Sequence, residues 1–184
     1  LHPGADARRV SFVLSRDGLS VAHSGVAALH ELPPAQGEVV AVVPWQRLSW
    51  HAVTLPPQSG PRLGAVLHGL LEEQLLDDPA QLHLAVAPHA PTRSGGATLV
   101  AACSRDWLQQ ALAPLEAAGL RVQRLVPDGA PTSATETVLQ VVQHNGQALA
   151  LLRHPQGITP IPHATRSAWS QALADVSVCW SEPG

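Results

Sequence analysis

Apolar residues along the chain fall into short runs that predict strands and into two stretches with helical spacing. Residues 10–14 and 19–23 flank Asp17-Gly18. Such a dipeptide between two strand-like runs is typical of a hairpin, because glycine accepts a positive φ. Residues 39–43 are all apolar and end at Pro44, so we expect a strand buried on both faces. Further strands are expected over residues 48–55, 82–87, 97–103 and 120–126.

The clearest helix follows Ser59 and Pro61, a capping residue and a proline suited to the first helical turn. Its main apolar stripe consists of Leu63, Leu67, Leu70 and Leu71. At about 100° per residue, Gln74 falls within that stripe. A buried amide without partners would cost about 1 to 3 kcal/mol. We therefore expect Gln74 to bond main-chain groups of a neighbouring strand or loop.

The exit of this helix, residues 70–78, carries the candidate partner-binding residues. On the helical wheel, Leu76 is expected on the face away from the core, beside the acidic residues Glu72, Glu73, Asp77 and Asp78. An exposed leucine with an acidic rim would form a small docking spot for a partner protein. In the competing interpretation the acids only solubilise the outer face, while Leu76 packs beneath the exit loop.

A second helix is expected from Ser104 to Gly119, with glycine as its left-handed cap. Pro114 lies inside this helix and predicts a kink or a break, because proline removes one main-chain hydrogen bond and crowds the preceding turn. Residues 127–133 are rich in Pro, Gly, Asp and Ser, and this composition predicts a linker.

The part beyond the linker also opens with a hairpin pattern. Residues 138–143 and 148–153 flank Asn145-Gly146. The remaining expected elements are a strand over residues 158–161, interrupted by proline, a helix over 165–174 and a strand over 176–180. This mixture of strands and helices predicts an α/β protein with mixed sheets.

Composition narrows the range of functions. Hydrophobic residues make up 45% of the 184-residue chain, enough to build a core. Charged residues are only 14% and the net charge is -3, so we expect no nucleic-acid partner. No apolar run approaches the roughly 18 to 20 residues that span a bilayer, and we expect no direct membrane insertion of this fragment. Because the sequence contains no Met, we do not expect Leu1 to be the natural start.

The usual signatures of chemistry are missing from the sequence. Cys103 and Cys179 each end a short apolar run without a CxxC pair, a pattern typical of buried thiols in a reducing compartment. Ten histidines show no HxH or HxxxH spacing, so we expect no metal site. No GxxxxGK[ST], GxGxxG or GxSxG motif occurs. We therefore assign no catalytic or cofactor-binding residues.

Two stretches carry a family resemblance. Residues 53–86, "VTLPPQSGPRLGAVLHGLLEEQLLDDPAQLHLAV", are similar to the strand, LP turn, helix and acidic exit of the type II secretion system L protein (GspL) family. Within them, "LLEEQLLDD" is closest to the family pattern. Residues 99–128, "LVAACSRDWLQQALAPLEAAGLRVQRLVPD", resemble the next element of that family and, more loosely, the PilM proteins of type IV pili.

The resemblance implies an actin-like fold with ribonuclease H-like lobes and mixed sheets. On that scheme residues 1–47 and 104–130 form the first lobe, residues 48–103 form an inserted strand-helix-strand-strand subdomain, and residues 131–184 form a second lobe that is shorter than the family's. The two hairpin patterns would open the two lobes.

The resemblance also implies a role without catalysis, in the cytoplasm at the bacterial inner membrane. The L family recruits the secretion ATPase, the E protein, to the inner-membrane platform. Its transmembrane helix and periplasmic domain, which pair with the M protein, normally follow this region. A homodimer is a further partner that we consider. A PilM-like pilus assembly protein remains an alternative.

An actin-like nucleotide-binding enzyme is the other alternative, because many actin-like proteins hydrolyse ATP. Such enzymes hold phosphate and Mg²⁺ at an Asp-x-Gly-type turn in each lobe. Here the first hairpin offers only Asp17 directly before Gly18, and the second hairpin, "QHNGQA", has no carboxylate. We therefore interpret Asp17 as a turn residue and expect no cofactor.

Overall fold

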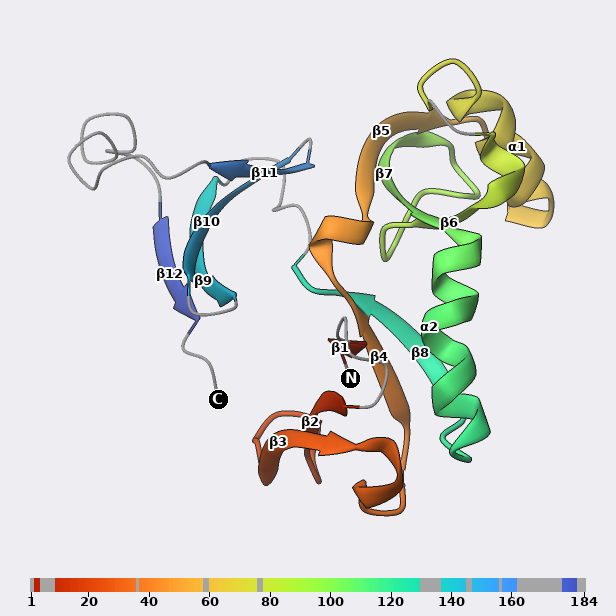
Figure 1. Cartoon of the computed structure of the whole chain (residues 1–184). Helices are drawn as coiled ribbons and strands as arrows, with labels where there is room; N and C mark the ends of the chain where they lie inside the picture. Colours follow the sequence, from red (N-terminus) through yellow and green to blue (C-terminus); the bar gives the residue numbers. More distant parts are fainter. Residues whose placement is uncertain are drawn as a thin grey trace. The chain divides into compact units, whose positions relative to one another are not determined.

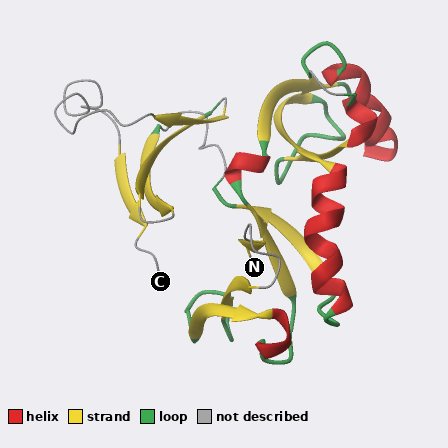
Figure 2. Ribbon diagram, in the orientation of Figure 1, coloured by secondary structure: helices red, strands yellow, loops and turns green. Residues whose placement is uncertain are grey.

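A computed structural model of the chain describes residues 2–3, 9–35, 37–57, 60–75, 78–129, 137–144, 147–155, 157–161 and 177–181. The chain divides into two compact units, Leu1–Asp128 and Gly129–Gly184. Figures 1 and 2 show the elements of each unit. The division falls inside the stretch that composition predicts to be a linker.

The first strands of the first unit form an antiparallel sheet. In it, β2 (Arg9–Leu14) lies between β1 (His2–Pro3) and β3 (His23–Ala28). Val10 and Phe12 are buried and alternate along β2 with exposed residues. A Cβ atom on Gly25, opposite Phe12, would lie 3.4 Å from the Phe12 ring. The absence of a side chain at Gly25 therefore leaves room for that ring.

The second strand of this hairpin begins at His23, and the prediction of a strand over residues 19–23 is wrong. Residues 15–22 form a loop whose N–H groups are bonded locally. The Gly18 N–H donates to the Ser15 Oγ at 2.9 Å, and the Ser20 N–H donates to the Asp17 Oδ1 at 2.8 Å. Because side chains satisfy these main-chain groups, a strand ladder is not needed there.

The central strands of the first unit, β4 (Val39–Val43) and β8 (Val122–Pro127), pair in parallel. Helix α2 (Arg105–Ala117) lies beside them (Figure 1) and buries Leu108 and Leu115. A small core joins Val43, Cys103 and Leu108. The predicted strand over residues 39–43 is confirmed.

Helix α2 starts and stops at the predicted residues. The Ser104 Oγ accepts from the Trp107 N–H at 3.3 Å. Gly119 has φ 78°, and the Leu120 N–H donates to the Leu115 carbonyl at 2.9 Å, which is the bonding expected of a glycine C-cap. The helix runs past Pro114 to Ala117, so the predicted break does not occur. The buried side chain of Leu115, directly after the proline, anchors the last turn.

A third sheet consists of β5 (Ser49–Leu55), β7 (Gly96–Ser104) and β6 (Leu82–Val86), with β7 in the middle. Helix α1 (Leu63–Leu71) covers one face of it (Figure 1). The core between them contains Val53, Leu55, Leu67, Leu71 and Val100. Leu67 and Leu71 are four residues apart on one helical face, as the apolar stripe predicts. Whether residues 48–103 form an inserted subdomain stays a prediction.

Short 3-10 helices connect these elements. Those in the described residues are η1 (Leu29–Glu31), η2 (Trp45–Arg47), η3 (Gly60–Arg62) and η4 (Pro79–Gln81). Helix α1 begins directly after η3. The predicted capping residue Ser59 lies outside the described residues.

The second unit is a sheet of order β11-β10-β9-β12. The predicted hairpin is confirmed, because β9 (Val138–His144) and β10 (Gln147–His154) pair antiparallel. At one edge β11 (Gly157–Ile161) contains Pro160, as edge strands tolerate. At the other edge β12 (Ser177–Ser181) runs parallel to β9. The predicted turn at residues 145–146 and the predicted helix over 165–174 lie outside the described residues.

Candidate functional site

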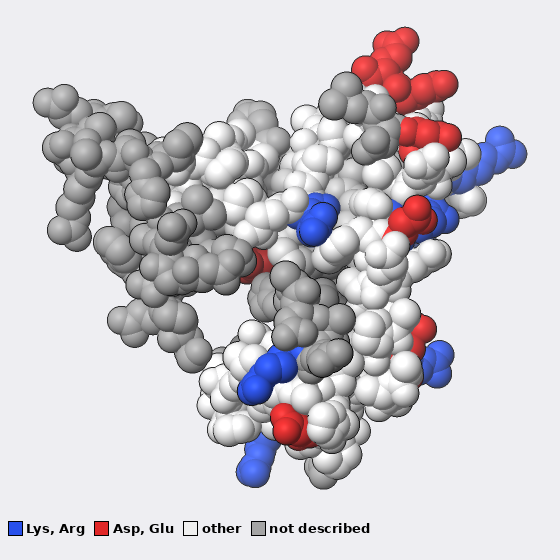
Figure 3. Space-filling model, viewed as in Figure 1, with Lys and Arg blue, Asp and Glu red and all other residues white. Residues whose placement is uncertain are grey.

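The acidic exit of α1 is the candidate partner-binding surface. Glu72 and Glu73 follow the last helical residue and are exposed. Asp78 is exposed too, and its Oδ1 accepts from the Ala80 N–H at 2.9 Å, so it caps η4. Acidic side chains gather over this end of the first unit in Figure 3. Leu76 and Asp77 lie outside the described residues, so their part in this surface stays a prediction.

The prediction of a buried Gln74 is wrong. Helix α1 ends at Leu71, and the chain then turns, with the Gln74 and Leu75 N–H groups both bonded to the Leu71 carbonyl. Gln74 is exposed, and its Nε2 donates to the Leu70 carbonyl at 3.4 Å. Leu75 packs on the core instead. The helical wheel fails at this position because the helix stops three residues before it.

Asp17 is the residue that an actin-like nucleotide site would need in the first hairpin, and its carboxylate is engaged within its own loop. It accepts from the main-chain N–H groups of Ser20 and Leu19, and from the hydroxyls of Ser20 and Ser15. These donors, the Ser20 N–H above all, hold the pKa of Asp17 well below its usual value. The bonding fits a turn residue, as the sequence predicts.

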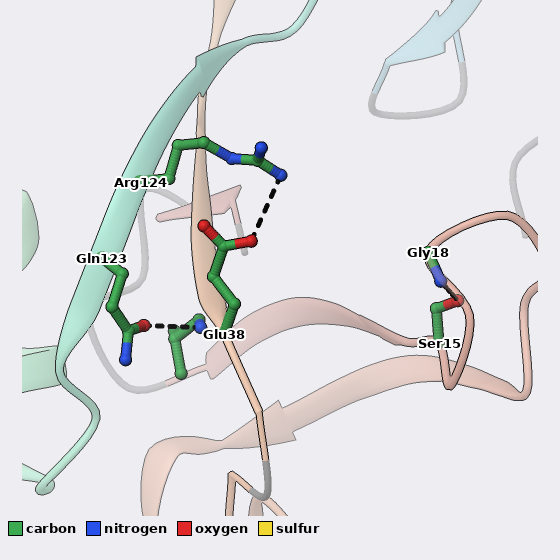
Figure 4. A network of polar contacts seen from close by, with 6 residues as sticks. Ser15, Gly18, Glu38, Gln123 and Arg124 are labelled. Atoms are coloured by element: carbon green, nitrogen blue, oxygen red, sulfur yellow. Dashed lines mark hydrogen bonds and ion pairs between the residues drawn. The ribbon is translucent and has the colours of Figure 1, made fainter.

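A groove of about 700 Å³ lies between the end of β2 and the start of β4. Much of its lining is apolar and includes Phe12, Leu14, Leu32, Pro33, Val39 and Leu120. At its rim the carboxylate of Glu38 lies 3.4 Å from the Arg124 guanidinium, and the Val39 N–H donates to Gln123 (Figure 4). The Glu38 carboxylate is thus paired, and the polar side chains of Arg16 and His23 also line the groove. Sequence reasoning missed it because residues distant along the chain line it.

Burial shifts the pKa of two further side chains of the first unit, Cys103 and His51. Burial raises the pKa of the Cys103 thiol, an effect that nearby Arg47 partly offsets, so its nucleophilic thiolate form is disfavoured. Partial burial lowers the pKa of His51, whose Nε2 lies 2.9 Å from the Ser49 Oγ. In the described part of the chain, no three His, Cys, Asp or Glu side chains gather as they would around a metal ion.

Trp50 and Trp107 of the first unit are half-buried. The Arg47 guanidinium lies 5.3 Å from the centroid of the Trp107 ring, a cation–π arrangement. The indole nitrogen of Trp50 is buried and has no hydrogen-bond partner among the described residues.

None of the described helices has the length and apolar character that crossing a membrane requires.

Comparison with known proteins identifies the family. The family model described as "Type II secretion system (T2SS), protein L" matches residues 10–180. A relative from Pectobacterium carotovorum with that name is 28% identical over 172 residues, which cover 90% of this chain and 38% of the relative. Another, from Dickeya chrysanthemi, is 29% identical over 147 residues, covering 80% of this chain and 34% of the relative. The chain thus spans little more than a third of the curated relatives it matches.

Solved structures agree on the fold. The cytoplasmic domain of EpsL, an inner-membrane component of the type II secretion system of Vibrio cholerae, matches with a TM-score of 0.61 and 23% identity, covering 92% of this chain and 75% of that one. The PilM–PilN type IV pilus biogenesis complex matches with a TM-score of 0.50 and 13% identity, covering 90% and 61%. Both neighbours are actin-like, which confirms the predicted fold class. The family match favours the L resemblance over the PilM one, and the chain belongs to the type II secretion system protein L family.

Proposed function

We propose that this domain is a non-catalytic adaptor of the type II secretion inner-membrane platform. It acts at the cytoplasmic face of the bacterial inner membrane, where it recruits the secretion ATPase, the E protein. Family membership carries this proposal, and the name of the EpsL neighbour supports the location. The full-length protein would be a single-pass inner-membrane protein that meets the M protein and other platform components through regions beyond these residues.

The state of Asp17 supports a role without catalysis. A carboxylate that organises Mg²⁺ and phosphate must present free oxygen atoms to the metal. Both oxygens of Asp17 already accept hydrogen bonds from its own loop. The actin-like enzyme alternative predicts Mg²⁺-dependent ATP binding in the micromolar range. Isothermal titration of residues 1–184 with Mg·ATP tests it, and such binding would contradict the adaptor reading.

The acidic exit of α1 is the docking surface in this proposal. Exposed carboxylates at Glu72, Glu73 and Asp78 would meet a basic patch on the ATPase, and Leu76 with Asp77 would complete the contact. Such electrostatic complementarity governs specificity and association rate. The exposed acids that follow α1 support this choice, and the alternative is that they only solubilise that end of the molecule.

Binding of the purified domain to the N-terminal domain of the secretion ATPase tests both levels of the proposal. Glu72→Arg/Glu73→Arg should weaken binding at least tenfold because it places cations against a basic patch. Glu116→Arg, on the exposed face of α2, is the matched control and should leave binding unchanged. If wild type binds and the double variant binds equally well, the surface is wrong. If the folded wild type does not bind, the adaptor proposal fails.

A further inference from the structure

Strand β3 is an edge strand of its sheet, and in the described part of the chain no strand pairs with its outer edge. The Leu14 carbonyl accepts a bond from the Ala22 N–H, so the main-chain groups of β2 at Leu14 turn toward β3. Such positions alternate along an antiparallel pair. Given the register, the main-chain groups of Val26 and Ala28 therefore turn toward the outer edge. An edge of this kind offers donors and acceptors to another strand.

Two charged side chains form hydrogen bonds with main-chain groups on this edge. The Arg9 Nη2 donates to the Val26 carbonyl at 2.9 Å. The Ala28 N–H donates to the Glu31 Oε2, also at 2.9 Å. Glu31 follows Ala28 by three residues and its bond also caps η1. Together Arg9 and Glu31 take one acceptor and one donor that an added strand would need.

The side chains around the edge would otherwise favour association. Val13 and Val26 are 60% and 56% exposed. Val26 pairs with Ser11 and Val13 with Ser24, so the two valines are diagonal neighbours on the outward face of the sheet. Strand β3 itself, with sequence HSGVAA, contains no proline, Lys, Arg, Asp or Glu. Proline and charge, two of the devices that protect an edge, are therefore missing from the strand itself.

We infer that Arg9 and Glu31, by bonding main-chain groups of β3, prevent this edge from pairing with β3 of a second copy of this chain. An antiparallel pair about a two-fold axis at Val26 would set each Val26 opposite its counterpart and Gly25 opposite Ala27. Every contact along the strand would then join small or neutral residues, so no like charges oppose the pairing. The same edge serves both copies, as a two-fold interface requires.

Removing both caps tests the inference. Arg9→Ala/Glu31→Ala should show a concentration-dependent doubling of molar mass relative to wild type in size-exclusion chromatography with light scattering. Adding Val26→Lys should abolish the doubling, because two cations would then face each other across the axis. Glu116→Ala/Arg121→Ala, which removes exposed charges elsewhere in the same unit, should behave as wild type.

Hydrogen exchange supplies a test that needs no dimer. The Ala28 amide should exchange slowly in wild type and faster in Glu31→Ala, while the Gly25 and Ala27 amides, which face β2, stay slow in both. The inference is overturned if the folded double variant keeps the wild-type mass, if Val26→Lys leaves the dimer intact, or if wild type already pairs through β3. It is also overturned if the Ala28 amide exchanges freely in wild type.

Discussion

Replacing Gly95 with alanine should destabilise the first unit sharply. Gly95 precedes β7 and has φ +76°. A Cβ there would lie 2.8 Å from the Pro57 nitrogen and 2.9 Å from the Leu55 carbonyl oxygen. Both contacts are with main-chain atoms at the end of β5, so no side-chain rotation relieves them. The loop between β6 and β7 would have to move away from β5.

The size of the effect follows from two contributions. A left-handed conformation costs alanine about 1 to 2 kcal/mol, and forcing an extra methyl group into a packed site typically costs about 1 to 3 kcal/mol. We therefore expect Gly95→Ala to lower the free energy of unfolding by about 2 to 5 kcal/mol. Urea unfolding followed by tryptophan fluorescence measures it, because Trp50 lies on β5, paired with Ala101 of β7 in the sheet that the substitution disturbs.

Gly69→Ala is the matched control. Gly69 is exposed inside α1, and a Cβ there meets no atom within 4 Å. Alanine is the better helix former, so this variant should gain up to about 1 kcal/mol. If Gly95→Ala unfolds within about 0.5 kcal/mol of wild type, within the range of ordinary surface substitutions, the close approach of the loop to β5 is refuted. A lower free energy of unfolding for Gly95→Ala together with a higher one for Gly69→Ala would support the close approach.

Three further outcomes are expected. Leu71→Ala should cost about 2 to 5 kcal/mol in urea unfolding, because the side chain is 0% exposed and its removal leaves a cavity beneath α1. Asp17→Asn should lower the melting temperature at neutral pH, and the difference should shrink as the pH falls below about 4. The pKa of Asp17 is depressed on folding, so its contribution is present above the unfolded-state pKa and is lost as the pH falls. Ser104→Ala removes the bond to the Trp107 N–H and should cost about 1 kcal/mol in the same unfolding assay.

Most elements were predictable because local chemistry specifies them. Residues 39–43 form a strand because an all-apolar run bounded by proline has few alternatives. Helix α2 begins at the serine cap and ends at the glycine cap that its sequence predicts. The second-unit hairpin follows from apolar runs on either side of Asn145-Gly146. In each case the deciding residues are neighbours in the sequence.

Two predictions fail for different physical reasons. The helical wheel puts Gln74 in the core because it assumes that α1 continues, whereas the helix ends at Leu71 and Leu75 packs on the core instead. The strand predicted over residues 19–23 is replaced by a loop, whose N–H groups are bonded by Ser15 and Asp17. Periodicity alone gives no signal for side-chain bonds of this kind, although Ser and Asp are the residues that make them.

Some features of the candidate surfaces were predictable from the sequence, and others were not. The family, the actin-like fold and the acidic exit of α1 were evident from the sequence, because each depends on the order of residues along contiguous segments. Only the tertiary structure decided that the Glu38 carboxylate is paired with Arg124 beside the groove. It alone brought Arg9 to the edge of β3, with which no strand pairs in the described part of the chain. Those two contacts join residues far apart in the sequence, and packing sets their distances in ways that no local pattern records.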